Sequence, residues 1–342
     1  MHAIADTWYI AALSATLGTK PMAVVIQGRP LVLFRMSTGQ ASALSDRCPH
    51  RNVPLSMGVV KNGELECAYH GWRFDGAGAC VAVPGLVDGT VSLKSRCAET
   101  WATEERDGFV WVYSTPSVSP TTPAYTFPHV ADVGYTTVRR RFEVNASVHA
   151  MVENTLDVPH TAFLHGGLFR TANKKNVIDV VVRRHPTWAE AEFIGEPRPS
   201  GLIGRLLAPR GGVVEHTDRF LLPSIAQVEY RLGEASHLLS TSVMTPVSAD
   251  KTVVYAVVTF RLPLPSWLVK PFVMPVAQRI FAQDAVVLAR QTQQIAQFGG
   301  QEKFTSTELD VLGPYVSKLL KQAAANEPPP QGVHEHRLKM KV

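Results

Sequence analysis

Two short runs of sequence pair a cysteine with a histidine: Cys48-Pro49-His50, and then Cys67-Ala68-Tyr69-His70. Sixteen residues separate the two runs, and each run offers one thiolate and one imidazole. A hairpin between them would bring the two halves face to face. The spacing therefore predicts one metal site that is built from two matching halves.

Two kinds of metal site take two cysteines and two histidines. In a Rieske [2Fe–2S] centre the cysteines bind one iron and the histidines bind the other, which would assign Cys48 and Cys67 to one iron and His50 and His70 to the second. A tetrahedral zinc site accepts the same four side chains. However, Cys-x-His is not the usual zinc-finger spacing, and the neighbouring residues predict β turns rather than a short helix. The pattern favours the iron–sulfur cluster.

Length and composition limit what kind of protein this is. The chain has 342 residues, which suits two domains of ~100–200 residues each. With 45% hydrophobic and 18% charged residues the chain is not disordered, and four cysteines are too few for a disulfide scaffold. We expect the two remaining cysteines, Cys80 and Cys97, to be buried as small hydrophobic residues.

The formal net charge of +5 is spread along the chain, and it includes a basic tail from His334 to Val342 that we expect to be loose. Solvated surface is the simplest interpretation, and a docking face for an acidic electron-transfer partner is the alternative. We expect no nucleic-acid binding. The first residues lack the pattern of a signal peptide, and no run reaches the ~18–20 apolar residues of a membrane span. These features predict a cytoplasmic protein.

The strand and helix patterns predict an α+β protein with two domains. Residues 1–118 hold short strand-like runs between turns, such as 31–34 and 108–113, which predict an antiparallel β domain. Residues 119–342 predict a catalytic domain with an antiparallel sheet and a long C-terminal helix. Its expected elements are strands at 135–144, 177–182 and 252–260, and helices at 148–165, 276–298 and 309–325.

A second set of metal-binding side chains lies in the predicted second domain. His160 and His165 are five positions apart, which is ~140° on an ideal helix, so both reach one ion only if the helix bends or ends nearby. Pro159 is a plausible cause of a bend. Asp284 is a lone acid within an apolar helix, where a carboxylate is costly unless it is paired or bound to a metal. Two histidines and one carboxylate form the facial triad of non-heme Fe(II) oxygenases.

Both sets of residues resemble those of one family, the Rieske non-heme iron oxygenases. Residues 48–74 closely resemble its Rieske domain, and residues 153–165 match its Glu-x₃-Asp-x₂-His-x₄-His segment at every specified position. Respiratory-chain Rieske proteins carry two further cysteines, at positions that are Val53 and Tyr69 here, so the match is to the oxygenase and ferredoxin branch.

The resemblance implies a role for each acid and histidine of the second set. His160, His165 and Asp284 would bind the mononuclear Fe(II). Asp157 would bridge to a Rieske histidine of a neighbouring subunit, which implies a homotrimer. Glu153, one helical turn earlier, would support the site from behind.

The same resemblance implies a monooxygenase that uses O₂. No nucleotide-binding fingerprint is present, so its electrons would come from NAD(P)H through a separate reductase, with or without a ferredoxin. The two alternatives that are not enzymes are a Rieske electron carrier and a zinc-stabilised binding module.

The substrate pocket is expected from residues 201–281, which are apolar and poor in acids. Residues 220–230 resemble the sterol-acting members of the family, the sterol C-4 demethylases and cholesterol 7-desaturases. This implies a bulky hydrophobic substrate, with residues 263–275 in peripheral contact with the inner face of a membrane. The alternative is an enzyme of the dicamba monooxygenase type that O-demethylates methoxy-aromatic acids. Its substrate carboxylate would need a buried arginine such as Arg205, Arg210 or Arg219.

Overall fold

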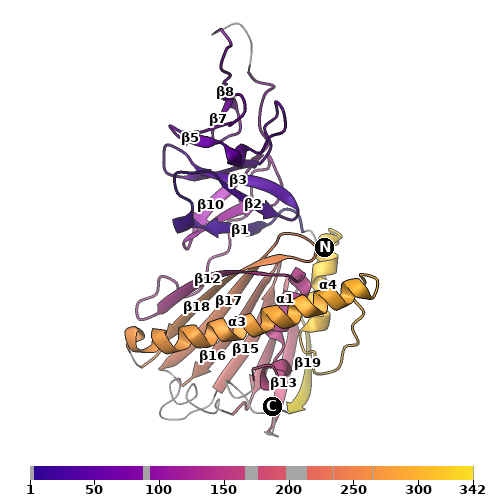
Figure 1. Cartoon of the computed structure of the whole chain (residues 1–342). Helices are drawn as coiled ribbons and strands as arrows, with labels where there is room; N and C mark the ends of the chain where they lie inside the picture. Colours follow the sequence, from indigo (N-terminus) through magenta and orange to yellow (C-terminus); the bar gives the residue numbers. More distant parts are fainter. Residues whose placement is uncertain are drawn as a thin grey trace. The chain divides into compact units, whose positions relative to one another are not determined.

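The protein folds into two compact units (Figure 1). The computed structural model describes residues 4–87, 93–165, 176–197, 214–233, 235–263 and 265–341. Of the described residues, those from 4 to 126 and from 245 to 248 form the N-terminal unit, and those from 127 to 244 and from 249 to 341 form the C-terminal unit. The domain boundary that the sequence suggests after residue 118 stays a prediction.

The N-terminal unit consists of short antiparallel strands in three sheets, ordered β1-β11-β10, β2-β3-β4-β9 and β5-β6-β7-β8. Their bounds are β1 Trp8–Leu13, β2 Met22–Ile26, β3 Arg29–Arg35, β4 Ala41–Ser45, β5 Val59–Lys61, β6 Glu64–Glu66, β7 Arg73–Phe74, β8 Cys80–Ala82, β9 Thr100–Trp101, β10 Thr103–Arg106 and β11 Phe109–Tyr113, with 3₁₀ turns η1 Ser14–Thr16 and η2 Leu55–Met57.

Strand β3 joins two hydrophobic cores because successive side chains of a strand point to opposite faces. Leu31 and Leu33 pack into a core with Tyr9 and Trp101. Val32 and Phe34 pack into a second core, which also holds the Cys48 and Cys67 side chains. The four-residue apolar run that predicted a strand is therefore buried on both of its faces.

The hairpin between the two Cys-His runs depends on Asn62 and Gly63. Both residues have positive φ, 53° and 80°, which is the conformation of a two-residue turn joining β5 and β6. A Cβ on Gly63 would lie 2.0 Å from the backbone nitrogen of Ser37, so only glycine fits this position. The turn fixes the register of the hairpin that connects the two halves of the predicted metal site.

The C-terminal unit is an eight-stranded antiparallel sheet in the order β12-β18-β17-β16-β15-β14-β13-β19, and the long helix α3 runs across one of its faces (Figure 1). Helix α1 packs against both α3 and α4. The elements are β12 Thr136–Val144, α1 Val148–Leu156, η3 Pro159–Ala162, β13 Val177–Arg184, β14 Trp188–Ile194, β15 Val214–Leu221, β16 Ile225–Leu232, β17 Ser236–Pro246, β18 Thr252–Arg261, α3 Ser266–Gln297, α4 Gly313–Ala324 and β19 His334–Lys341. The expected α+β class is confirmed.

The tail that the sequence predicted to be loose is strand β19. It pairs with β13 along its whole length, from His334 opposite Arg184 to Lys341 opposite Val177. Leu338 and Met340 turn inwards and alternate with outward charged residues, and Met340 is only 3% exposed. The prediction was wrong because the count of basic residues hid this period-two alternation, which is the signature of a half-buried strand.

Three further expectations differ from the structure. Helix α3 begins at Ser266, not near residue 276, and continues through Pro271 and Pro275. Each proline removes one hydrogen bond of the helix, but the residues around it still pair. The helix expected over 148–165 ends at Leu156 and resumes as a 3₁₀ turn that begins at Pro159. Cys97 is exposed, because its neighbour Ala98 takes the inward position, whereas Cys80 is buried as expected.

The sheet has one face that is covered by helices and one outer face. Directly opposed residues of an antiparallel ladder share a face. Asp218 opposes Ala191, Ala191 opposes Val182, and Val182 opposes His336. The His336 ring contacts the Tyr315 hydroxyl of α4 at 3.0 Å, so Asp218 lies on the face that the helices cover.

A buried ion triad occupies this covered face. The His216 ring is held between Glu196 Oε2, 2.6 Å from Nδ1, and Asp218 Oδ1, 2.9 Å from Nε2. It is also stacked between Phe193 and Tyr230, with ring centroids 4.4 and 4.2 Å away. Burial lowers the pKa of His216, but the two carboxylates outweigh burial and raise that pKa to about 9. The imidazole is therefore charged at neutral pH although it is only 1% exposed.

The triad predicts how the stability of the protein depends on pH. The folded pKa of His216 lies above its ordinary value of 6.5, so this contribution to the free energy of unfolding is complete below about pH 6.5 and is lost as the pH rises through about 9. Asp218→Asn should cost ~3–5 kcal/mol at neutral pH and shift that loss to lower pH. Denaturant unfolding across this range measures both effects. Asp179→Asn, at an exposed acid, is the control. Equal stability of the Asp218 and Asp179 variants would contradict the prediction.

Candidate metal centres

The two Cys-His runs form two loops with matching backbone geometry. The Cys48 amide donates to the Val53 carbonyl at 2.9 Å, and the Cys67 amide donates to the Trp72 carbonyl at 2.8 Å. Four residues after each cysteine, the amides of Asn52 and Gly71 donate back to the carbonyls of Cys48 and Cys67, at 2.8 and 3.0 Å. Asn52 and Gly71 both have positive φ, 63° and 69°, which asparagine and glycine tolerate best. Each loop therefore holds its cysteine and histidine in the same way.

The side chains of these loops meet at one place. Cys48 and Cys67 are 1% and 3% exposed, and the His50 and His70 rings lie 4.6 Å apart between centroids. Burial, together with the neighbouring Cys67, raises the pKa of the Cys48 thiol to about 11. The buried Nδ1 atom of His50 has no hydrogen-bond partner in the described chain. Two buried thiols and an unpartnered imidazole nitrogen are what a metal cluster would satisfy, since the metal would bind the thiols as thiolates.

A second group of side chains lies where the turn after α1 meets α3. His160, His165 and Asp284 place ligand atoms within 4.8 Å of one another. Asp284 Oδ1 is 3.1 Å from Nε2 of His165 and 3.6 Å from Nε2 of His160. Nε2 of His165 is buried without a hydrogen-bond partner in the described residues, so it faces the carboxylate without being satisfied by it. A divalent metal would complete this arrangement, and the residues fit a mononuclear site.

Each of the three ligand side chains is held from behind by another residue. Nδ1 of His160 contacts the backbone carbonyl of Asp157, and Nδ1 of His165 lies 3.0 Å from Gln283 Oε1. Asn154 Nδ2 donates to Asp284 Oδ1 at 3.4 Å. These contacts turn both Nε2 atoms towards Asp284, as the outer contacts of metal-binding histidines commonly do. Sequence reasoning missed Asn154 and Gln283. The one available signal was their position beside predicted site residues.

The electrostatics of this site favour a cation. Burial lowers the pKa of His160, but Asp157 and Asp284 outweigh it and raise that pKa to about 9. Asp157 Oδ2 lies 3.4 Å from His160 Nδ1, and its side chain is 38% exposed. Asp157 is the C-cap residue directly after α1 and is extended, with φ −85° and ψ 106°. Its carboxylate therefore touches a predicted iron ligand and also reaches solvent.

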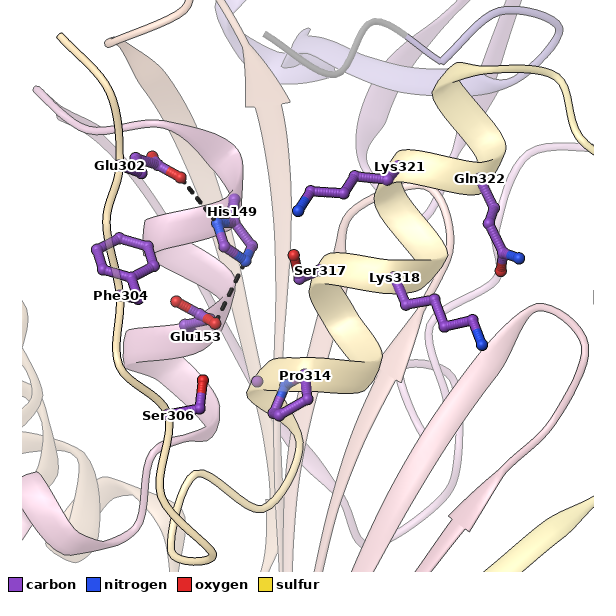
Figure 2. Close-up of a pocket in the computed structure, with 11 residues that line it drawn as sticks. His149, Glu153, Glu302, Phe304, Ser306, Pro314, Ser317, Lys318, Lys321 and Gln322 are labelled. Atoms are coloured by element: carbon purple, nitrogen blue, oxygen red, sulfur yellow. Dashed lines mark hydrogen bonds and ion pairs between the residues drawn. The ribbon is translucent and has the colours of Figure 1, made fainter.

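Glu153, a residue of α1, lines a cavity of about 520 Å³ (Figure 2). Its Oε1 atom is 3.3 Å from Nε2 of His149, and the other ring nitrogen is 3.3 Å from Glu302 Oε2. Burial lowers the pKa of His149, but the two glutamates raise it to about 9. A Cβ on Gly313 would lie 2.9 Å from Glu153 Oε1, so a glycine lets α4 begin beside this carboxylate. Glu153, one helical turn before Asp157, thus contacts His149 of α1 and lies beside the first residue of α4.

Comparison with family models matches both units. Residues 7–96 match the Rieske [2Fe-2S] domain, and residues 144–326, more than half of the chain, match the vanillate O-demethylase oxygenase C-terminal domain. Together with the grouping of His160, His165 and Asp284, these matches assign a Rieske [2Fe–2S] cluster and a mononuclear non-heme iron to the protein.

Three curated proteins that are similar in sequence to this chain have names that differ from one another. The oxygenase component of dicamba O-demethylase from Stenotrophomonas maltophilia is 34% identical over 169 residues, 48% of each chain. Protein TIC 55 of Arabidopsis thaliana is 28% identical over 84% of this chain and 53% of its own. The 4beta-methylsterol monooxygenase of Methylococcus capsulatus is 33% identical over 46% of this chain and 44% of its own. The matches thus span about half the length of these relatives.

Solved structures share the fold at low sequence identity. Dicamba monooxygenase bound to dicamba has a TM-score of 0.78 at 24% identity, covering 95% of this chain and 99% of that one. NdmA of Pseudomonas putida CBB5 with caffeine also has a TM-score of 0.78, at 22% identity, covering 94% and 91%. The likeness establishes the arrangement of elements in the fold.

The geometry predicts that the mononuclear iron can be lost while the cluster is retained. Asp284→Ala should remove the mononuclear iron, because it deletes the only carboxylate among the three grouped ligands. Acid-labile sulfide and the visible absorption of the cluster should stay unchanged. Metal analysis of the purified variant measures the first effect and spectroscopy the second. Asp310→Ala, at another acid of the C-terminal unit, should retain both centres. Full iron content in the Asp284 variant would move the third ligand elsewhere.

Proposed function

The chain belongs to the Rieske non-heme iron oxygenases, a family of oxidoreductases, and on that premise we propose that it is a monooxygenase. It hydroxylates or oxidatively demethylates a bulky hydrophobic substrate, for which a sterol is the leading candidate. The observation that carries the proposal is the buried Asp284 carboxylate facing Nε2 of both His160 and His165. An electron carrier has no use for this arrangement, which leaves open positions on a bound iron for O₂.

We assign the iron ligands as follows. Cys48 and Cys67 hold one iron of the cluster, and His50 and His70 hold the other. His160, His165 and Asp284 hold the mononuclear Fe(II). When bound, the cluster supplies single electrons and the mononuclear iron supplies the chemistry that activates O₂. The protein keeps the ligands in place, through Gln283 behind His165 and Asn154 beside Asp284.

The reaction needs reducing equivalents from outside the chain. Inserting one oxygen atom of O₂ into a C–H bond and releasing the other as water consumes two electrons and two protons. We propose that a separate reductase draws these electrons from NAD(P)H and passes them to the cluster, directly or through a ferredoxin. Asp157 then links the two centres across a subunit boundary in a homotrimer. Its half-exposed carboxylate, 3.4 Å from the His160 ring, supports this role because a partner's histidine could reach it.

Two observations support a neutral, hydrophobic substrate. Arg219, a candidate partner for a substrate carboxylate, lies on the outer face of the sheet, paired with Glu190 at 3.2 Å and Glu229 at 2.6 Å. It is therefore not free to bind a methoxy-aromatic acid. The other two arginines considered from the sequence, Arg205 and Arg210, lie outside the described residues, as does the whole stretch 201–213 of the expected pocket region. The similarity to 4beta-methylsterol monooxygenase favours a sterol.

A methoxy-aromatic acid is the second candidate substrate. It rests on the dicamba O-demethylase relative, which is the more similar of the two named enzymes by a small margin in identity. The two candidates differ in charge, because the acid is an anion at neutral pH and a sterol is neutral. A site for the acid would need an arginine or a similar donor within the pocket.

We also propose peripheral contact with a membrane through the start of α3. Trp267 and Leu268 are 70% and 42% exposed there, and both are side chains that insert readily at a lipid surface. None of the helices in the described part of the chain has the length and apolar character needed to cross a membrane.

Product analysis tests the proposed function. The purified protein, loaded with both iron centres, would be given a reductase, NADH and a panel of sterols and methoxy-aromatic acids, with mass spectrometry of the products. We expect an oxygenated sterol whose new oxygen derives from ¹⁸O₂. Formaldehyde with a demethylated acid would establish the second candidate instead. Reduction of the cluster without any product across the panel would favour the electron carrier.

Asp157→Asn tests the electron bridge. Both metal centres should remain bound, because neither set of ligands loses a donor, while oxidation of the reduced cluster in a single turnover should slow ~10–100-fold. Stopped-flow absorbance follows that step directly. Glu308→Gln, at an exposed acid of the same unit, should leave the rate unchanged. A normal rate in the Asp157 variant, or a monomer by light scattering, would count against transfer between subunits.

A further inference from the structure

The guanidinium of Arg96 lies near His50, a predicted ligand of the cluster, and both pack against the Trp72 ring. The His50 ring is stacked on Trp72, with centroids 4.6 Å apart and planes only 4° from parallel. The Arg96 guanidinium carbon lies over the same indole, 5.6 Å from its centroid. The two distances together keep the guanidinium within about 10 Å of the His50 ring, which is about one Debye length in 0.1 M salt.

The Arg96 charge also reaches the core that surrounds the cluster ligands. Cys80 packs into the same core as Cys48 and Cys67. Burial raises the pKa of the Cys80 thiol, and the positive charge of Arg96 acts in the opposite direction and lowers it. Arg96 and Trp72 are both only half-exposed, so water screens this charge less than it screens a charge on the open surface.

We propose that Arg96, held over the Trp72 ring, raises the reduction potential of the Rieske cluster. This inference rests on the proposed assignment of Cys48, His50, Cys67 and His70 as cluster ligands. Reduction transfers one electron from the reductase to the oxidised cluster and adds one negative charge, while no bond to Arg96 forms or breaks. A nearby positive charge stabilises the reduced cluster more than the oxidised one, so it favours electron uptake. Trp72 holds the guanidinium in place by a cation–π contact.

The same unit contains a matched control for this arrangement. The Arg29 guanidinium carbon lies over Trp101, 5.4 Å from the ring centroid. Trp101 packs into the core formed with Tyr9 and Leu31, whereas the predicted ligands Cys48 and Cys67 belong to the other core. Arg29→Gln therefore removes the same kind of cation–π pair from the same unit, but from an indole that is not stacked on a predicted ligand.

Voltammetry of the full-length protein loaded with both iron centres measures the effect. Arg96→Gln should lower the equilibrium constant for cluster reduction about tenfold, which is ~59 mV for one electron. Arg96→Lys should retain most of the wild-type potential because it keeps the charge. The cluster of Arg29→Gln should have the same reduction potential as that of the wild type. The difference between Arg96→Gln and the wild type should shrink as the ionic strength rises.

The possible outcomes separate this inference from the proposed function. A wild-type protein without the absorption and EPR signals of a Rieske cluster would overturn the ligand assignment itself. Normal signals with an unchanged potential in Arg96→Gln would overturn only the role of Arg96. An equal drop in Arg96→Lys and Arg96→Gln would do the same, because charge would then not be the cause. If Arg96→Gln does not retain its cluster, Trp72→Phe replaces it. Phenylalanine holds the guanidinium more weakly, so the potential should fall, and an unchanged potential would overturn the role.

Discussion

One buried carboxylate constrains the C-terminal unit. Asp284 is 6% exposed on α3, where an uncompensated negative charge would be costly. The charge is tolerated because two imidazoles from the turn after α1 face it. This turn is far from α3 in the sequence: His165 and Gln283, which are in contact, are 118 positions apart. Helices α1 and α3 must therefore meet at this point. The contacts of Asn154, Asp157 and Gln283 with the three side chains add to this constraint, because they also join α1, the turn after it and α3.

The parts of the site that sequence reasoning found are those whose chemistry needs a local spacing. The two Cys-His runs sit in loops closed by the same two backbone hydrogen bonds, which short-range pattern reading can anticipate. His160 and His165 could be paired from the sequence because Pro159 suggested a bend in the helix expected over 148–165, although the helix in fact ends at Leu156. Asp284 could be found because a single acid within an apolar helix has few explanations. Each of these signals lies within a few neighbouring residues.

The parts that were missed depend on contacts between distant segments or on weak local signals. Gln283 and Asn154 matter only because α3 approaches the turn after α1, which no short pattern encodes. Pro271 and Pro275 argued for a break, yet the rest of α3 continues the helix through both of them. The sequence singled out Glu153 but not its neighbour Gly313, which lies beside it because α1 packs against α4. In each of these cases tertiary packing determines the structure, and the local sequence either favours a different structure or gives no signal.

Strand β19 also limits how this protein can vary. Its inward residues, His336, Leu338 and Met340, share the covered face of the sheet with Asp218, whereas Glu335, Arg337 and Lys339 point outwards. In saturation mutagenesis of this strand, tolerance to substitution should therefore alternate along the sequence. Every second position should accept almost any polar residue. The outward charges also discourage a foreign strand from pairing with β19, which is the last strand of the sheet in the described part of the chain. Selection for solubility and selection for packing thus act on alternate residues of the same short segment.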